Sequence, residues 1–119
     1  MKTGRKKTGG KYHASRKKRQ YEKPGQRRIT KLGEEKRKSK TTRGGNRKVY
    51  LLKAKFINIY ENGKSAKAEI KNVLETPSNR FFARQNILTK GTIVETSKGK
   101  ARITNRPTQE GVVNGVLVK

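Results

Sequence analysis

Apolar residues are concentrated after position 48, where short apolar runs alternate with turn-forming residues. This pattern predicts strands. The run from 49 to 60 alternates imperfectly and leads into Glu-Asn-Gly-Lys at 61–64, in which Asn-Gly accepts the positive φ of a hairpin turn. The returning segment 65–76 fits both helical and strand spacing, and the hairpin turn before it favours a strand.

Residues 77–86 break this pattern and predict a loop or one short helix, in which Arg80 and Arg84 would share a face. Beyond them, strands are expected at 87–88, 92–96, 101–106 and 112–118, with Gly91 marking a bulge or tight bend and turns at 97–100 and 107–111. Five or six short strands predict a mainly β fold, a small closed or nearly closed barrel, because closure removes exposed strand edges. The expected core residues are Phe56, Ile57, Ile70, Ile93, Ile103, Val113 and Leu117.

Residues 2–48 lack the alternation altogether. They hold five apolar residues, and their twenty Lys and Arg against three Glu carry about +17 of the chain's +25 net charge. Such a segment buries too little apolar surface to offset the entropy that it loses on ordering. We therefore predict two domains: a basic extension at 1–48, disordered without RNA, and a small β-barrel domain at 49–119.

The charge indicates the class of partner. A pI near 11.0 points to a polyanion, and nucleic acid is favoured because cations that contact phosphates release condensed counterions. Residues 49–119 are also basic, with thirteen Lys and Arg against five Glu, so one face of the barrel is expected to touch the same polyanion. The alternative is an evenly solvated basic surface.

Within the extension, cations alternate with glycines and aromatic residues. Tyr12, His13 and Tyr21 can stack on unpaired bases, whereas the alternative is a solvated basic run with incidental tyrosines. Gly9 and Gly10 do not form a P-loop, since no buried strand precedes them, and they can let the backbone bend around a ligand. The predicted RNA-binding residues are Arg5, Lys6, Lys7, Gly9, Gly10, Lys11, Tyr12, His13, Arg16, Lys17, Lys18, Arg19, Tyr21, Arg27, Arg28, Lys36, Arg37, Lys38, Lys40, Arg43, Gly44, Gly45, Asn46, Arg47, Lys48, Arg80 and Arg84.

The rest of the extension predicts little regular structure. Residues 26–32 read as extended or irregular, and 40–48 as a linker that grips phosphates through hydroxyls, cations and a flexible Gly-Gly. Glu34 and Glu35 are adjacent and point different ways on a helix or a strand, so they are expected to be salt-bridge partners or a helix start rather than a paired-carboxylate site.

Composition excludes several kinds of chemistry. The chain has no Cys, which excludes disulfides and thiolate chemistry, and no Asp, which excludes Asp-containing triads. His13 is the only histidine, too few for an ordinary zinc site. We expect no catalytic residues, no metal site, no cofactor, no small-molecule substrate and hence no enzyme. Membrane binding is not expected either, since apolar spans and amphipathic anchors are lacking. The absence of Cys favours an intracellular setting, and we expect a cytoplasmic location.

Several sequence blocks resemble one known family. The blocks are Thr8-Gly9-Gly10-Lys11-Tyr12-His13, Lys31-Leu32-Gly33-Glu34, Thr42-Arg43-Gly44-Gly45-Asn46-Arg47-Lys48, Ile87-Leu88-Thr89-Lys90-Gly91 and Asn105-Arg106-Pro107. Spread over nearly the whole chain, they resemble small-subunit ribosomal protein eight of the e-type, a family of archaea and eukaryotes, and the short chain resembles its archaeal branch.

The resemblance implies a β-barrel body with an N-terminal extension embedded in rRNA of the small ribosomal subunit. The family's motif positions carry over as expected RNA contacts to Gly9, Gly10, Lys11, Arg43, Gly44, Gly45, Asn46 and Arg47, while residues 20–28 match less closely. The expected partners are small-subunit rRNA and neighbouring ribosomal proteins. The main alternative is a chromatin-type protein that compacts DNA, which would bind generic duplex DNA at least as well as folded rRNA.

Overall fold

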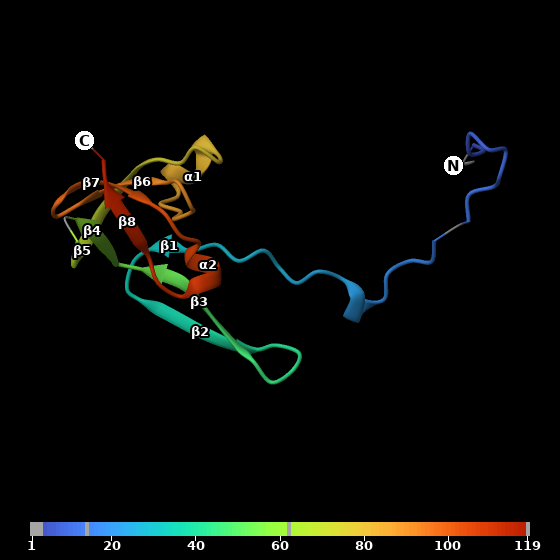
Figure 1. Cartoon of the computed structure of the whole chain (residues 1–119), viewed down its shortest axis with the longest axis horizontal. Coiled ribbons are helices and arrows are strands. Elements are labelled where there is room, and N and C mark those ends of the chain that lie inside the picture. Colours follow the sequence, from blue (N-terminus) through green and yellow to red (C-terminus); the bar gives the residue numbers. More distant parts are fainter. Residues whose placement is uncertain (1–3, 14, 62, 119) are drawn as a thin grey trace.

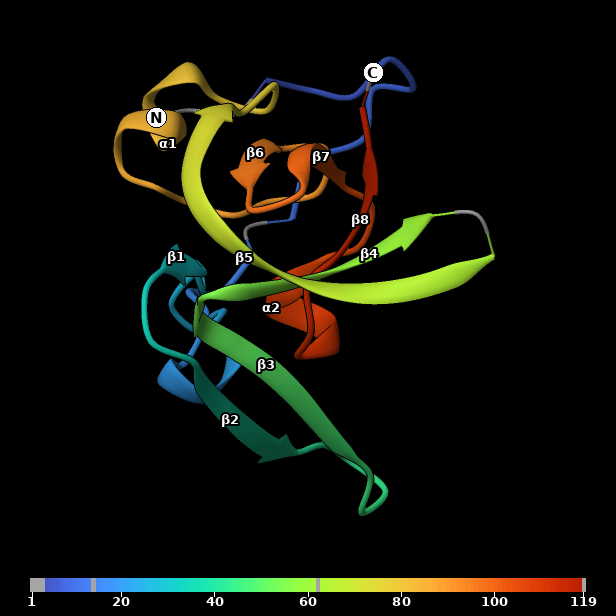
Figure 2. The same cartoon turned by 90° about the vertical axis from the view of Figure 1, so that its left-hand side faces the viewer.

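A five-stranded barrel forms the body of the protein. The computed structural model describes residues 4–13, 15–61 and 63–118. The barrel consists of β4 (Phe56–Glu61), β5 (Lys64–Glu75), β6 (Ile93–Thr96), β7 (Gly99–Ile103) and β8 (Asn114–Leu117), which pair in this order (Figures 1 and 2). Parallel pairing of β4 with β8 closes the ring, so the predicted mainly β fold with a small closed barrel is confirmed.

A second, three-stranded sheet lies beside the barrel in the order β1-β3-β2, built from β1 (Lys31–Leu32), β2 (Lys36–Thr41) and β3 (Arg47–Ala54). The sequence pattern does not predict this sheet. Residues 26–32, expected to be extended or irregular, end in β1. Residues 40–48, expected to be a linker, form the outer part of the β2–β3 hairpin. The run 49–60 is likewise two strands, interrupted at Lys55.

The core follows the alternation along the strands. Ile57, Ile70, Ile103 and Val113 are buried as predicted. Phe56 was assigned to the wrong face: Ile57 and Ile59 point inward, so the intervening positions point outward and Phe56 is 37% exposed. Ile93 and Leu117 are half-buried. The buried apolar residues that the sequence analysis missed are Leu51, Ala54, Ile59, Ala68, Val73, Ile87, Leu88, Val94 and Ala101.

Two short helices flank the barrel. The predicted single helix is α1 (Arg80–Arg84), which begins where the Asn79 side chain accepts a hydrogen bond from the Phe81 backbone N–H at 3.0 Å. The second, α2 (Pro107–Glu110), stands where a turn was predicted, with Pro107 in its first turn. The Asn105 side chain ties α2 to β8, since its Nδ2 donates to Glu110 and Val112 O and its Oδ1 accepts from the Asn114 N–H.

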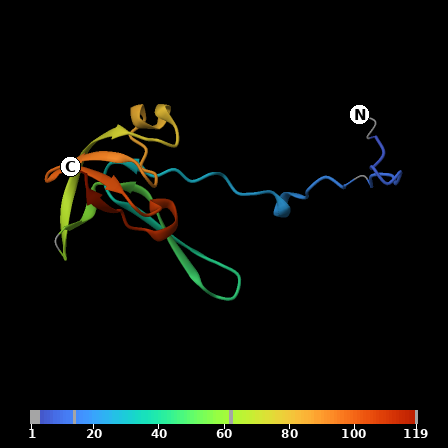
Figure 3. The same cartoon turned by 45° about the horizontal axis from the view of Figure 1, so that its top comes forward.

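The chain enters this body at Thr30. Thr30 is fully buried, its hydroxyl donates to Leu51 O at 2.8 Å, and its carbonyl accepts from the Leu88 N–H at 2.9 Å. On the N-terminal side of Thr30, every described residue from 4 to 29 is exposed, and the chain runs away from the barrel (Figures 1 and 3). The predicted hairpin, between β4 and β5, is confirmed by the pairing of Glu61 with Lys64; Asn62 lies outside the described residues.

Candidate nucleic-acid interface

The first described residues form a small cationic loop. Arg5 pairs with Lys11 in an isolated antiparallel bridge, and the Arg5 guanidinium donates to Gly9 O at 3.0 Å. Lys6 Nζ lies 5.7 Å from the centre of the Tyr12 ring. All of the loop is exposed. The structure therefore brings the predicted contacts Arg5, Lys6, Lys7, Gly9, Gly10, Lys11 and Tyr12 together on one short stretch.

One cation of the next basic run is already paired. Arg16 Nη1 donates to Glu22 Oε2 at 2.8 Å, and Glu22 ends the short 3₁₀ helix η1 (Gln20–Glu22). The Arg16 bond, followed by the bond from the Arg19 backbone N–H, lowers the pKa of Glu22, and the same pair raises the pKa of Arg16. Lys17, Lys18 and Arg19 are exposed, as is the Tyr21 ring.

We expect Glu22→Gln to raise the affinity for small-subunit rRNA about two- to fivefold, because it releases Arg16 for a phosphate. Because the pKa of Glu22 is lowered, the Arg16–Glu22 ion pair is intact above the ordinary carboxyl pKa and is lost as the pH falls through the lowered pKa. At neutral pH, Glu22→Gln therefore has the same effect on Arg16 as protonation of Glu22 in acid. Filter-binding assays of the full chain, with and without Glu22→Gln, measure the change in rRNA affinity. Glu95→Gln on β6 removes the same charge, and an equal gain there would mean that only net charge matters.

The β2–β3 hairpin carries a row of lysines on one face. Lys40 is directly opposite Lys48, and Lys38 is directly opposite Tyr50 one step further along the same face. Every residue of β2 is exposed. Like charges directly opposite one another destabilise a strand pair, so this hairpin carries an unfavourable repulsion that an anion would relieve. Arg37 and Arg47 lie on the opposite face, and Arg37 forms an ion pair with Glu35. The salt-bridge prediction for Glu35 is thus confirmed.

The tip of the hairpin holds the Arg-Gly-Gly-Asn block. Gly44 and Gly45 have φ of 84° and 80°, a conformation that favours glycine, and the loop is closed by the Thr42 N–H, which donates to Asn46 O at 2.6 Å. A Cβ at either glycine would meet nothing within 4 Å. The glycines are therefore required by the backbone conformation of the turn rather than by close packing, and their backbone is accessible to a ligand.

The root of the extension contributes a second cluster. Arg27 and Arg28 line a cavity of about 120 Å³ together with Lys90, Arg106 and Thr108. The Arg28 guanidinium lies 3.7 Å from the centre of the Tyr50 ring, which holds it in place. Lys90 and Arg106 were not among the predicted contacts, although both stand in the family blocks, because no local pattern places them beside residues 27–28.

Three further predicted positions lie elsewhere on the surface. Arg80 and Arg84 line a hollow on α1 with Phe81 and Ala83, and the Arg80 guanidinium lies 5.3 Å from the Phe81 ring centre. His13 is exposed next to Tyr12. Within the ranges 4–13, 15–61 and 63–118 the structure has no group of three or more residues suited to metal binding and no helix long and apolar enough to cross a membrane.

Comparison with known proteins bears directly on this arrangement. The model of the family described as ribosomal protein S8e matches residues 1–118, so the match includes the extension, the hairpin and the barrel. The chain belongs to the ribosomal protein S8e family. The family resemblance inferred from the sequence blocks is thereby confirmed.

Three archaeal relatives of this S8e chain carry the name small ribosomal subunit protein eS8. The protein of Nanoarchaeum equitans is 49% identical over 114 residues, which cover 94% of this chain and 90% of the relative. Those of Haloarcula marismortui and Methanosarcina barkeri are 44% identical over 115 and 45% identical over 117 residues, each covering 97% of this chain and 94% of the relative. The S8e chain and these relatives are therefore of similar length.

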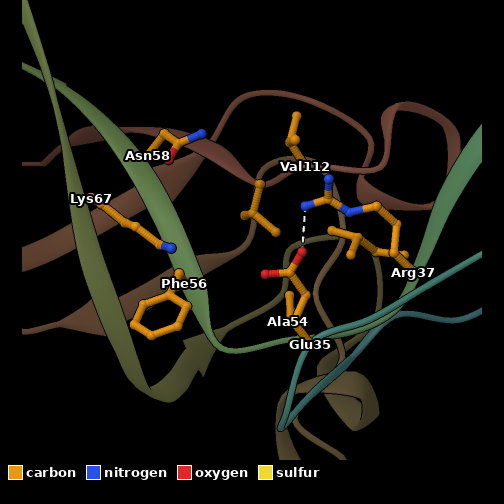
Figure 4. Close-up of a pocket in the computed structure, with 9 residues that line it drawn as sticks. Glu35, Arg37, Ala54, Phe56, Asn58, Lys67 and Val112 are labelled. Carbon is orange, nitrogen blue, oxygen red and sulfur yellow. Dashed lines mark hydrogen bonds and ion pairs between the residues drawn. The ribbon is translucent and has the colours of Figure 1, made fainter.

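A polar cleft lies where the two sheets of the S8e chain meet (Figure 4). It has a volume of about 140 Å³ and is lined by the Glu35–Arg37 pair, Asn58 and Lys67 among others. Lys67 Nζ lies 4.2 Å from the centre of the Phe56 ring. The cleft thus joins the base of the basic hairpin to the outer face of the barrel, where Phe56, Asn58 and Lys67 lie.

Proposed function

We propose that this chain is a constituent of the small ribosomal subunit that binds rRNA through its basic extension, residues 1–48, and through a basic face of the barrel domain, residues 49–119. The role is structural rather than catalytic, and it supports subunit assembly and translation alongside neighbouring ribosomal proteins. Membership of the S8e family and the names of the three relatives support it.

The observation that carries the proposal is the lysine row of the hairpin. Lys40 opposite Lys48, with Lys38 beside them, costs folding free energy in the free protein, since like charges directly opposite destabilise a strand pair by about 0.2–1 kcal/mol. A phosphate backbone laid along the row turns that repulsion into attraction. The exposed cations of residues 4–29 extend the same positive surface away from the barrel (Figure 1).

The mechanism is electrostatic and steric. The extension lies between RNA helices and neutralises phosphates so that the helices can approach one another, and it takes its final shape as it binds. Tyr12, His13 and Tyr21 are exposed beside the cations, which suits stacking on bases that are unpaired in loops or bulges. Equal or better affinity for generic duplex DNA than for folded small-subunit rRNA at matched salt would instead favour a chromatin-type protein.

We expect Lys48→Thr to change binding and stability in opposite directions. The affinity for rRNA should fall about three- to tenfold, because one phosphate contact is lost, while the free energy of unfolding should rise by a few tenths of a kcal/mol, because the repulsion with Lys40 is removed. Binding titrations and denaturant unfolding of the full chain measure the two effects.

Lys98→Thr is the matched control for this experiment. Lys98 is an exposed cation in the turn between β6 and β7, so its loss changes the net charge equally without touching the hairpin. If Lys48→Thr and Lys98→Thr reduce the rRNA affinity equally, the lysine row does not contact RNA more closely than any other surface cation, and the proposal loses its main support.

A further inference from the structure

We propose that the outer face of β4 and β8 binds a single unpaired nucleobase of RNA, at a site separate from the extension and the hairpin; the inference rests on the proposed rRNA-binding function. The site consists of two rows of side chains that point outward from the barrel. Strands β4 and β8 lie side by side in it, flanked by β5 and β7 (Figure 2).

The strand register defines the two rows. In the first row, Ser65, Tyr60, Val116 and Arg102 are successive partners across β5, β4, β8 and β7. In the second row, Lys67, Asn58 and Asn114 are successive partners across β5, β4 and β8. Partners in register point to the same side of a sheet, and neighbouring strands are about 4.8 Å apart, so each row is compact enough for one base.

Tyr60 supplies a stacking surface. Its side chain is 60% exposed, and the neighbouring Val116 is 42% exposed, which is unusual for two adjacent large apolar side chains. Cations lie over the rings of the other exposed aromatic residues of the barrel and α1, at Phe56 from Lys67 and at Phe81 from Arg80. Among the described residues no cation lies over Tyr60, so a face of its ring is open to a base.

The second row supplies groups that can read a base edge. Asn58 Nδ2 donates to Asn114 Oδ1 at 3.2 Å. This bond leaves the Asn58 carbonyl oxygen as an acceptor and the Asn114 amide nitrogen as a donor. An acceptor beside a donor matches the N6 and N7 edge of adenine. The N3–H and O4 edge of uracil also matches such a pair, so the two amides can read a base edge but do not by themselves select adenine.

The hollow between the rows has room for such a ligand. Its volume is about 490 Å³, and it is lined by both Asn side chains, Tyr60, Val116 and the hydroxyls of Ser65 and Thr104. Small-molecule sites lie in this size range and combine an apolar surface with a few polar groups.

The charges favour RNA over a protein partner as the occupant. The two rows hold two cations, Lys67 and Arg102, and no Glu. Since Lys67 already lies over the Phe56 ring, Arg102 is the cation that a phosphate beside the base would find. An apolar protein interface would leave these cations and the amide pair desolvated without counter-charge. Strand β4 lies at the end of the body opposite to the extension (Figure 1).

Tyrosine ring resonances of the isotope-labelled full chain, titrated with single-stranded heptaadenylate, test the proposal. Tyr60→Phe assigns the Tyr60 signal among the four tyrosines and keeps the ring. We expect ring-current shifts at Tyr60 and amide shifts at Asn58 and Asn114, with about tenfold weaker binding at this site in Tyr60→Leu and a change within about twofold in Tyr60→Phe. Heptauridylate should bind the site more weakly than heptaadenylate, because a pyrimidine stacks on the Tyr60 ring less strongly than a purine.

The matched control is Phe81→Leu, which removes an exposed ring beside arginines outside the site and should leave the Asn58 and Asn114 shifts unchanged. Since stacking releases no counterions, Tyr60→Leu should also leave the salt dependence of rRNA binding unchanged. Absence of shifts at Asn58 and Asn114, or equal binding by wild type and Tyr60→Leu, overturns the inference and leaves this face to a protein partner. The proposed rRNA-binding function fails separately, if the full chain shows no salt-dependent affinity for rRNA.

Discussion

Deletion of residues 2–26 is expected to weaken binding to small-subunit rRNA about a hundredfold or more at physiological salt, with the barrel still folded. The deleted segment holds ten Lys and Arg against Glu22 alone, and each lost phosphate contact reduces both the affinity and the slope of its logarithm against the logarithm of salt concentration. Binding isotherms at several salt concentrations measure both quantities.

The position of the cut follows from the packing. Arg28 is held on the Tyr50 ring and Thr30 is fully buried, whereas the described residues from 4 to 26 are all exposed and hydrogen bond only among themselves. Thermal unfolding of the truncated chain should therefore match that of the full chain.

A variant of the full chain with Tyr12→Leu and Tyr21→Leu is the matched control, because it keeps every cation and removes two exposed rings. If the double variant loses little rRNA affinity and the truncated chain loses much, the cations of the extension rather than its aromatic rings provide the affinity. If the truncated chain binds as tightly as the full chain at matched salt, the extension is not the main RNA contact.

Gly111→Ala is expected to be strongly destabilising, lowering the free energy of unfolding by about 2–5 kcal/mol. Gly111 ends α2 with φ of 71°, where an L side chain costs about 1–2 kcal/mol. A Cβ there would also stand 2.7 Å from Val49 Cγ1 and 3.1 Å from Val49 Cβ, and such overpacking costs about 1–3 kcal/mol more. Denaturant unfolding gives the difference.

Gly44→Ala separates these two costs. Gly44 has a similar φ of 84°, but a Cβ there would meet nothing within 4 Å, so only the backbone cost applies. Since α2 packs on β3, the excess loss in Gly111→Ala measures the steric cost of a Cβ against Val49 of that strand. Equal losses in the two variants would mean that Val49 moves aside freely.

The strands of the barrel were the part of the fold that the sequence could predict. Ile57 and Ile59 alternate with exposed positions, and Gly63 has a φ of 79°, as the hairpin turn requires, so both features follow from the local sequence. Phe56 shows the limit of this reasoning. Its large ring suggests burial, but alternate residues of a strand point to opposite faces, and Phe56 belongs to the outward set. Which set points inward depends on the other strands of the barrel.

The hairpin was the part of the candidate interface that the sequence could not predict. Strand β2 reads Lys-Arg-Lys-Ser-Lys-Thr, which has no apolar alternation and low strand propensity. It forms because β3, anchored by the buried Leu51 and Ala54, offers it a hydrogen-bonding edge. Its cations were identified from composition, but the pairing of Lys40 with Lys48 follows only from the register.

The amino-acid sequence by itself determined the charge, its concentration before position 49 and the β character of the remainder, since these depend on composition and on alternation between near neighbours. The tertiary structure alone decided which distant groups meet: Arg27 and Arg28 with Lys90 and Arg106 at the root of the extension, and Tyr60 with the two Asn side chains on the barrel face. These groups come together because the barrel closes by pairing its first strand with its last, and no local pattern encodes that closure.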